Sequence, residues 1–138
     1  MMIDKNATDK QEIGYISSDI NNALKTLINS SIDLEGAVIL VGPNNLNHVQ
    51  ERHPESFNKY TESLSVIISS PDYVGVHPNG QSIELIKKLE ENVLVAIRLR
   101  SNGPLWVKSF YEITNSKLSN YVSSGRVVDM SSPNIKTS

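Results

Sequence analysis

The residues best suited to chemistry in this chain of 138 residues lie in the segment Asn44–His53, NNLNHVQERH, which Pro54 follows. His48, Arg52 and His53 fall within six residues there. An imidazole titrates near neutral pH and can move a proton. A guanidinium group can hold a phosphate and the negative charge that develops on it. The pattern is therefore suited to cleavage of a phosphodiester bond without a metal ion.

A purely structural role for these residues stays open. His53 shares one face of the predicted helix with Leu46 and Val49, so it also fits a half-buried core histidine. His48 and Arg52 lie on the opposite side, where solvation is the alternative. The two histidines are five residues apart and a proline follows the second, so one helical face cannot present both rings to one ion. We therefore expect no metal site and no cofactor.

The predicted strands Val93–Arg100 and Leu105–Thr114 supply a second group of candidates. Strict alternation along the strands places four polar side chains on the open face of a sheet: Arg98, Lys108, Glu112 and Thr114. Two cations, a carboxylate and a hydroxyl are able to bind a phosphate and to deprotonate a ribose 2′-hydroxyl. Ordinary solvation is the alternative, because the open face of an antiparallel sheet is generally polar.

The same alternation makes Trp106 and Phe110 exposed aromatic side chains on that face, and it places Ser109 and Tyr111 on the apolar side. Exposed aromatics beside cations stack on the bases of single-stranded RNA. The two rings fit equally well under the segment Lys117–Ser124 or in a partner interface.

The elements that must position these residues follow from hydrophobic periodicity. Helical spacing predicts helices from Ser18 to about Asn29–Ser31, over Asn44–His53, from Pro54 to Ser69, and over Lys117–Ser124. Apolar runs and alternation predict strands at Ile13–Ile16, Ala37–Val41, Tyr73–Val76, Ser82–Leu89, Val93–Arg100, Leu105–Thr114 and Arg126–Met130. This order indicates an α+β fold, with N-terminal helices packed on an antiparallel sheet of about four to five strands.

Length and composition restrict the class of protein. A chain of 138 residues makes one domain. We place it at residues 13–130, between a disordered tail at residues 1–12 and a C-terminal tail at residues 131–138. The formal net charge of -2 argues against bulk binding to phosphate backbones. The absence of cysteine removes thiol chemistry and fits a cytoplasmic protein, and no apolar stretch suits a signal peptide or a membrane span.

The order of the segments carries a family resemblance. A strand ending in VILVG precedes the helix NHVQERHP, a helix ending in IISSPDYV, a strand hairpin and the strand VKSFYEIT. This order resembles the phage-type members of the barnase–EndoU–colicin–RelE-like nuclease superfamily, which share the BECR fold. The resemblance covers about residues 13 to 125. Its most specific part is the run of His48, Arg52, His53 and Pro54, and the segment Pro71–Val74 gives weaker support.

The resemblance implies a small metal-independent ribonuclease, associated with phages, prophages or toxins, in which a 2′-hydroxyl attacks the adjacent phosphate. Together with the patterns above, it leads us to expect catalytic roles for His48, Arg52, His53, Lys108, Ser109 and Thr114. Contacts with the substrate are expected from Arg98, Trp106, Phe110 and Tyr111. The expected partners are an RNA substrate, either tRNA or mRNA, and an inhibitor or immunity protein.

Two features depart from the family pattern. Ser109 stands where a threonine is expected. The acidic balance differs from free-standing ribonuclease toxins, which are usually basic. The alternative is therefore a catalytically inactive phage accessory protein that binds a protein or RNA partner.

Overall fold

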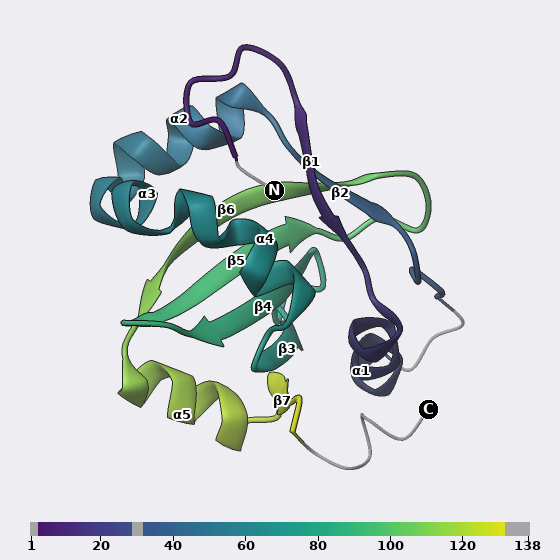
Figure 1. Cartoon of the computed structure of the whole chain (residues 1–138). Helices are drawn as coiled ribbons and strands as arrows, with labels where there is room; N and C mark the ends of the chain where they lie inside the picture. The colour runs from purple at the N-terminus through teal and green to yellow at the C-terminus, as the bar shows by residue number, and fades with distance from the viewer. Residues whose placement is uncertain (1–2, 29–31, 132–138) are drawn as a thin grey trace.

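The computed structural model describes residues 3–28 and 32–131, over which the chain is an α+β domain (Figure 1). Its strands are β1 (Gln11–Tyr15), β2 (Val38–Val41), β3 (Tyr73–Val76), β4 (Ser82–Lys88), β5 (Asn92–Arg98), β6 (Leu105–Ile113) and β7 (Val127–Asp129). Its helices are α1 (Ser18–Ile28), α2 (Pro43–Arg52), α3 (Pro54–Tyr60), α4 (Leu64–Ser69) and α5 (Asn115–Ser123), and the 3-10 turn η1 (Thr61–Ser63) joins α3 to α4. The predicted α+β class is confirmed. The predicted end of the first helix at Asn29–Ser31 lies outside the described residues.

The seven described strands form one mixed sheet in the order β1-β2-β6-β5-β4-β3-β7. Neighbouring strands are antiparallel, except that β2 and β6 run parallel through the pairs Ile39↔Leu105 and Leu40↔Trp106. The prediction of four to five antiparallel strands is therefore wrong. The short strands β1, β2 and β7 join the sheet because pairing lets them bury apolar side chains that an isolated strand would expose.

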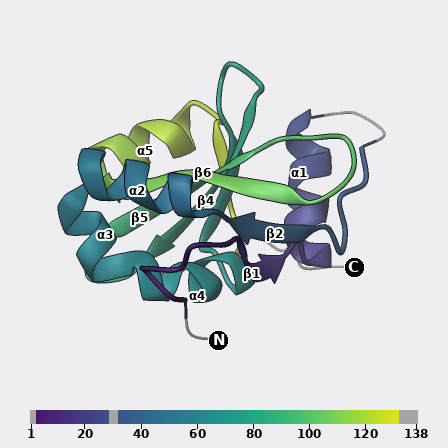
Figure 2. The ribbon, with the colours of Figure 1, turned by 90° about the horizontal axis from the view of Figure 1, so that it is seen from above.

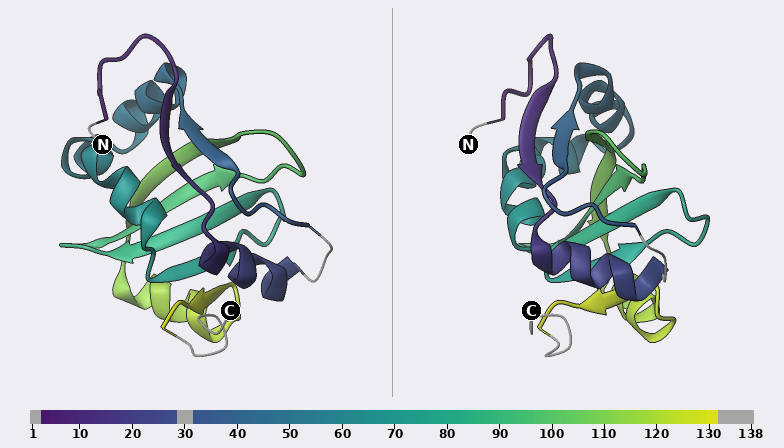
Figure 3. Two further views of the ribbon diagram at one scale, coloured as in Figure 1. Left: turned by 45° about the vertical axis from the view of Figure 1, so that its right-hand side comes forward. Right: turned by 90° about the vertical axis from the view of Figure 1, so that its right-hand side faces the viewer.

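The sheet separates two apolar layers (Figure 2). Residues of α1 to α4 form one layer, and Val93, Val95 and Ile97 of β5 contribute to it. On the opposite side, α5 covers part of the sheet, and Leu118 of this helix packs in one cluster with Leu94 of β5. Both faces of β5 are thus covered, which explains why its residues are buried without alternation as far as Ile97. Figure 3 shows α1 and α2 at opposite ends of the sheet.

The helical spacing after Pro54 predicts one continuous helix, but the structure has two. The apolar residues with this spacing are buried, and η1 separates them into α3 and α4: Phe57, Tyr60, Leu64, Ile67 and Ile68. The buried Thr61 hydroxyl donates to the Phe57 carbonyl at 2.6 Å, and this kind of bond to the preceding turn bends helices. The bend lets α3 pack beside β6 while α4 packs on β1, β4 and β5.

A β-bulge interrupts the pairing of β5 with β6. Ala96 pairs with Ser109, whereas the next residue, Ile97, pairs with Val107. Lys108 is therefore the extra residue on β6. Because side chains alternate along a strand, one extra residue inverts the side to which every later side chain points.

The bulge corrects the faces predicted for β6. Phe110 points to the same layer as Val107 and is fully buried, so the prediction that it is an exposed stacking aromatic is wrong. Ser109 and Tyr111 pair with residues whose side chains lie on the α5 side, Ala96 and Leu94. Ser109 and Tyr111 thus lie on the sheet face that α5 covers only in part.

The N-terminal segment takes part in the fold from Ile3 onwards. Ile3 is buried in the core, the Asp4 N–H donates to Gln11 Oε1 at 2.8 Å, and β1 begins at Gln11. The domain boundary expected between residues 12 and 13 thus falls inside β1. Residues 1–2 and 132–138 of the expected tails lie outside the described ranges. Within these ranges, no helix has the length and apolar character needed to cross a membrane.

Candidate active site

His53 occupies the corner between α2 and α3. Its backbone N–H donates to the Val49 carbonyl at 2.7 Å at the end of α2, and its carbonyl accepts from the Phe57 N–H at 2.9 Å at the start of α3. Its φ of −137° and ψ of 64° are not helical, as expected for the residue before Pro54, whose ring disfavours helical geometry there. A backbone corner bonded on both sides therefore carries the imidazole.

α2 runs along the part of the β6 edge that β2 leaves unpaired. β2 pairs with β6 only at Leu105 and Trp106, and α2 and α3 pack beside the strand (Figure 1). Just before α2, Gly42 lies against the Trp106 ring, because a Cβ there would meet ring carbons at 3.4 Å and 4.0 Å. At the end of α2, the His53 ring contacts the Tyr111 ring, with centroids 5.1 Å apart and planes inclined by 31°. The helix therefore holds His53 against the far half of β6.

The His53 side chain is half-buried. Burial lowers its pKa below 6.5, and the positive charges of His48 and Arg52 lower the pKa further. His48 and Arg52 are both exposed, as the helical spacing predicted. At neutral pH the His53 imidazole is consequently uncharged and able to accept a proton.

A surface pocket of about 350 Å³ lies beside His53. It is lined by His53, Pro54, Glu55, Ser56, Tyr111 and Glu112. Ser56 is buried, and its Oγ accepts from the Glu112 N–H at 3.3 Å, which satisfies a backbone donor of β6. The predicted helix candidate His53 and the predicted strand candidate Tyr111 meet in this pocket.

Glu112 lies close to a second carboxyl group, that of Glu91 in the turn between β4 and β5. Glu112 Oε1 is buried and has no hydrogen-bond donor among the described residues. Glu91 accepts from the Tyr60 hydroxyl and from Lys59 Nζ, the latter at 3.1 Å. Burial raises the pKa of Glu112 and the Glu91 carboxyl raises it further, whereas the hydrogen bond from Tyr60 lowers the pKa of Glu91. Of the two carboxyl groups, Glu112 therefore holds a proton more readily than Glu91 does.

Tyr111 connects the pocket with the α5 side of the sheet. Burial raises the pKa of Tyr111, and the negative charge of Glu84 raises it further. The Glu84 side chain is 1% exposed, and the Nε and Nη2 atoms of Arg126 donate to its two carboxylate oxygens at 2.7 Å each. The Arg126 guanidinium also stacks on the Tyr121 ring, 3.9 Å from its centroid. This ion pair fastens the segment after α5 to β4.

The other predicted site residues are spread along β5 and β6. Arg98 and Lys108 are exposed. Ser109 is buried, and its hydroxyl oxygen has no partner among the described residues. The Thr114 hydroxyl accepts from the Lys117 N–H at 3.1 Å and caps α5, which accounts for threonine at this position without a role in chemistry.

The three aromatic residues predicted to contact the substrate lie in different environments. Tyr111 lines the pocket, Trp106 is half-buried beside the start of α2, and Phe110 is sealed in the core. The structure thus joins Tyr111 with His53, whose neighbours on α2 are His48 and Arg52. It does not bring Phe110 to that pocket.

Several residues around the pocket escaped sequence reasoning. Ser56 and Tyr60 lie on α3, which packs beside β6, and Glu91 lies in the turn before β5. Contacts between distant segments, and not a local pattern, bring these residues near Glu112. Glu84 did carry a signal, because a carboxylate inside the apolar strand segment Ile83–Ile86 requires a charged partner when buried.

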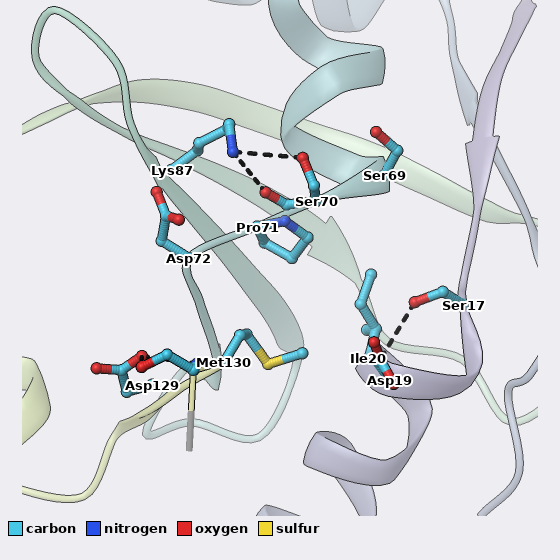
Figure 4. Close-up of a pocket in the computed structure, with 11 residues that line it drawn as sticks. Ser17, Asp19, Ile20, Ser69, Ser70, Pro71, Asp72, Lys87, Asp129 and Met130 are labelled. Carbon is cyan, nitrogen blue, oxygen red and sulfur yellow. Dashed lines mark hydrogen bonds between the residues drawn. The ribbon is translucent and has the colours of Figure 1, made fainter. Parts of the chain in front are cut away.

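A second hollow, of about 300 Å³, is lined by none of the predicted site residues (Figure 4). Lys87 Nζ donates to the Ser70 carbonyl at 2.7 Å and to its Oγ at 3.3 Å. Asp72 accepts from a backbone N–H of β4, and Asp129 accepts from Ser131. These polar groups hold the ends of secondary-structure elements together. Over residues 3–28 and 32–131, no group of three His, Cys, Asp or Glu side chains is arranged to hold a metal ion.

Comparison with known proteins identifies the family. Residues 11–120 match the family described as phage-Barnase-EndoU-ColicinE5/D-RelE like nuclease3. No curated protein and no solved structure matches the chain. The matched region runs from β1 into α5, so it contains the α2–α3 corner and all of β6. The chain belongs to the phage-Barnase-EndoU-ColicinE5/D-RelE like nuclease3 family and is a nuclease-like domain.

Proposed function

We propose that this domain is a metal-independent endoribonuclease that cleaves RNA by attack of a ribose 2′-hydroxyl on the adjacent phosphate. The observation that carries the proposal is the uncharged, half-buried imidazole of His53, which lines a pocket together with Tyr111. Membership of a nuclease family supports the class of reaction. RNA is the proposed substrate because only ribose supplies an internal 2′-hydroxyl nucleophile, which makes an ion-activated water unnecessary.

In this proposal His53 accepts the proton of the 2′-hydroxyl while the bond from O2′ to phosphorus forms. Arg52, exposed at the last position of α2, supports the charge that develops on the phosphate. Lys108 of β6 or Arg98 of β5 holds the flanking backbone, since both side chains are exposed cations. The ring contact with Tyr111 fixes the orientation of the imidazole.

The remaining predicted residues receive smaller roles. His48 is the second candidate for proton transfer, because it is exposed on the same helix. Ser109 is left out because its hydroxyl oxygen is buried and the residue does not line the pocket. Thr114 is left out because it caps α5. If the enzyme is active, we also propose a partner, an inhibitor protein that covers the pocket.

The experiment is an analysis of product ends. Purified protein is incubated with tRNA and with mRNA in an excess of chelator, and the fragments are examined by mass spectrometry. The proposal predicts 2′,3′-cyclic phosphate and 5′-hydroxyl ends, because the 2′-oxygen displaces the 5′-oxygen. Intact RNA at high enzyme concentration would contradict the proposal, and so would fragments with 5′-phosphate ends.

The acidic balance of the chain favours a second candidate function. With a formal net charge of -2, the domain lacks the general attraction for RNA that basic nucleases have. A catalytically inactive phage accessory protein that binds a protein or RNA partner would carry this charge without difficulty. For such a protein RNA stays intact, and when the partner is a protein, a short oligonucleotide does not shift the titration of His53.

A further inference from the structure

We propose that Glu112 donates the proton to the leaving 5′-oxygen, and that Glu91 is a positioning residue that keeps this proton on Glu112. The inference rests on the proposed ribonuclease function and names the second proton-transfer group of the same pocket.

The position of Glu112 is the first argument. It lines the pocket of about 350 Å³ that His53 also lines, so a phosphate bound there would lie beside both residues. Its backbone is fixed, because its N–H donates to the buried Ser56 hydroxyl at 3.3 Å. A group that transfers a proton must be held within reach of the reacting atom, and β6 supplies such a rigid support.

The contact with Glu91 is the second argument. Two neighbouring carboxylates repel each other, so the charge of one favours a proton on the other. Glu91 takes the charge because Tyr60 and Lys59 both donate to it. Glu112 Oε1 receives no donor among the described residues, so no hydrogen bond to this oxygen stabilises the charged form of Glu112.

The other charged groups around Glu112 do not reverse this assignment. From α3, the positive charge of Lys59 lowers the pKa of Glu112, whereas the negative charge of Glu55 raises it. Burial and the Glu91 carboxyl, the two largest influences, both raise that pKa. At the corner of α2 and α3, the pKa of His53 shifts downwards. The two pKa values thus shift towards each other, which favours an uncharged imidazole beside a protonated carboxyl.

The proposed step is balanced. His53 takes the proton from the 2′-hydroxyl, O2′ forms a bond to phosphorus, and the bond from phosphorus to O5′ breaks. Glu112 gives its proton to O5′, so the products are a 2′,3′-cyclic phosphate and a 5′-hydroxyl. The Glu112 carboxylate then recovers a proton from water, and His53 releases its proton to water.

The test compares pH–rate profiles for cleavage of one RNA oligonucleotide. Glu112→Gln keeps the size of the side chain but cannot donate an acidic proton, and we expect a loss of about 100-fold in kcat/KM at neutral pH. Glu91→Gln removes the neighbouring charge, so the alkaline limb of the profile moves to lower pH while activity on the acid side persists. Glu90→Gln, an exposed neighbour with the same change of charge, is the control.

Carboxyl NMR titration of Glu112 in the intact protein supplies a readout that is independent of activity. We expect Glu112 to titrate above the usual range of a glutamate in the wild type, and at lower pH in Glu91→Gln. Glu112→Gln activity within about threefold of the wild type would overturn the inference while leaving the ribonuclease function standing. An unmoved alkaline limb in Glu91→Gln would overturn the role of Glu91. A wild type that cleaves no RNA would remove the proposed function and this inference together.

Discussion

One proline determines much of the environment of His53. Pro54 disfavours helical geometry at the preceding residue, so α2 ends there and the imidazole sits at a corner instead of on a continuing helix. At that corner the ring packs against Tyr111 on one side and lines an open pocket. The His53 side chain is thus partly desolvated yet still reachable, which is the condition under which a histidine serves as a base near neutral pH.

The titration of His53 should reveal this environment directly. Its pKa is lowered below 6.5 by burial and by the charges of His48 and Arg52. The unfolded chain therefore takes up this proton at higher pH than the folded chain does. As the pH falls through 6.5, His53 makes the folded state less stable, and this loss is complete below the folded pKa.

The measurement is urea unfolding of the wild type and of His53→Asn between about pH 7.5 and pH 5, together with histidine NMR titration. We expect the wild type to lose stability more steeply than the variant over this range. Parallel pH dependences, or a His53 that titrates at or above 6.5, would contradict the described environment.

The sequence predicted the helix side of the site better than the strand side. Helical geometry over one segment is enough to place His48 and Arg52 on the face of α2 opposite its buried residues, and the structure agrees. The Glu91–Glu112 contact depends on the register of β5 with β6, which no single segment determines. It was therefore out of reach of reasoning from local pattern.

At the scale of elements, the bulge in β6 decides which side chains face the core. A strict alternation assigned Phe110 to solvent, and the extra residue Lys108 turned Phe110 into the core. No single residue type in the segment marks a bulge, since lysine at this position is equally compatible with an exposed strand position. The prediction of side-chain faces from strict alternation is therefore wrong for the residues of β6 that follow the bulge at Lys108.

The ion pair between Glu84 and Arg126 should be important for stability. Arg126→Met leaves the Glu84 carboxylate buried without its partner, which we expect to cost about 3 kcal/mol of unfolding free energy. The matched control is Lys117→Met, because Lys117 is exposed and also lies over the Tyr121 ring, at 5.9 Å from its centroid. We expect the control to change stability by less than about 0.5 kcal/mol.

Urea denaturation followed by the fluorescence of Trp106 measures both variants. The double variant Glu84→Leu, Arg126→Met should recover much of the lost stability, since it removes the unpaired charge together with its partner. Equal stability of Arg126→Met and Lys117→Met would show that the buried pair does not hold the segment after α5 to β4.

At the scale of the whole molecule, the order of strands is what the sequence did not reveal. A strand is present in each segment where periodicity placed one, including the edge strand near Ile13. The order of these strands in one seven-stranded sheet, with β6 between β2 and β5, depends on contacts between distant segments. Local pattern predicts the elements because it reports burial of each side chain, but it does not report which strand lies alongside.

The same distinction applies to function. The family match and the α2–α3 corner support a nuclease-like function. The formal net charge of -2, in contrast, gives the domain little general attraction for RNA. In the proposed function, catalysis therefore takes place in one pocket rather than on a broad basic surface, and RNA cleavage depends on the imidazole of His53.

The most direct test compares His53→Asn with His77→Asn on one RNA oligonucleotide in excess chelator. The Nδ1 atom of His77 accepts a hydrogen bond from the Asn79 backbone N–H in a turn, and an asparagine side chain is able to accept the same bond. With folding of both variants checked by thermal unfolding, we expect cleavage to fall by about 100-fold or more in His53→Asn and to change less than about twofold in His77→Asn. Wild-type cleavage rates in a folded His53→Asn would contradict the claim that this imidazole moves the proton.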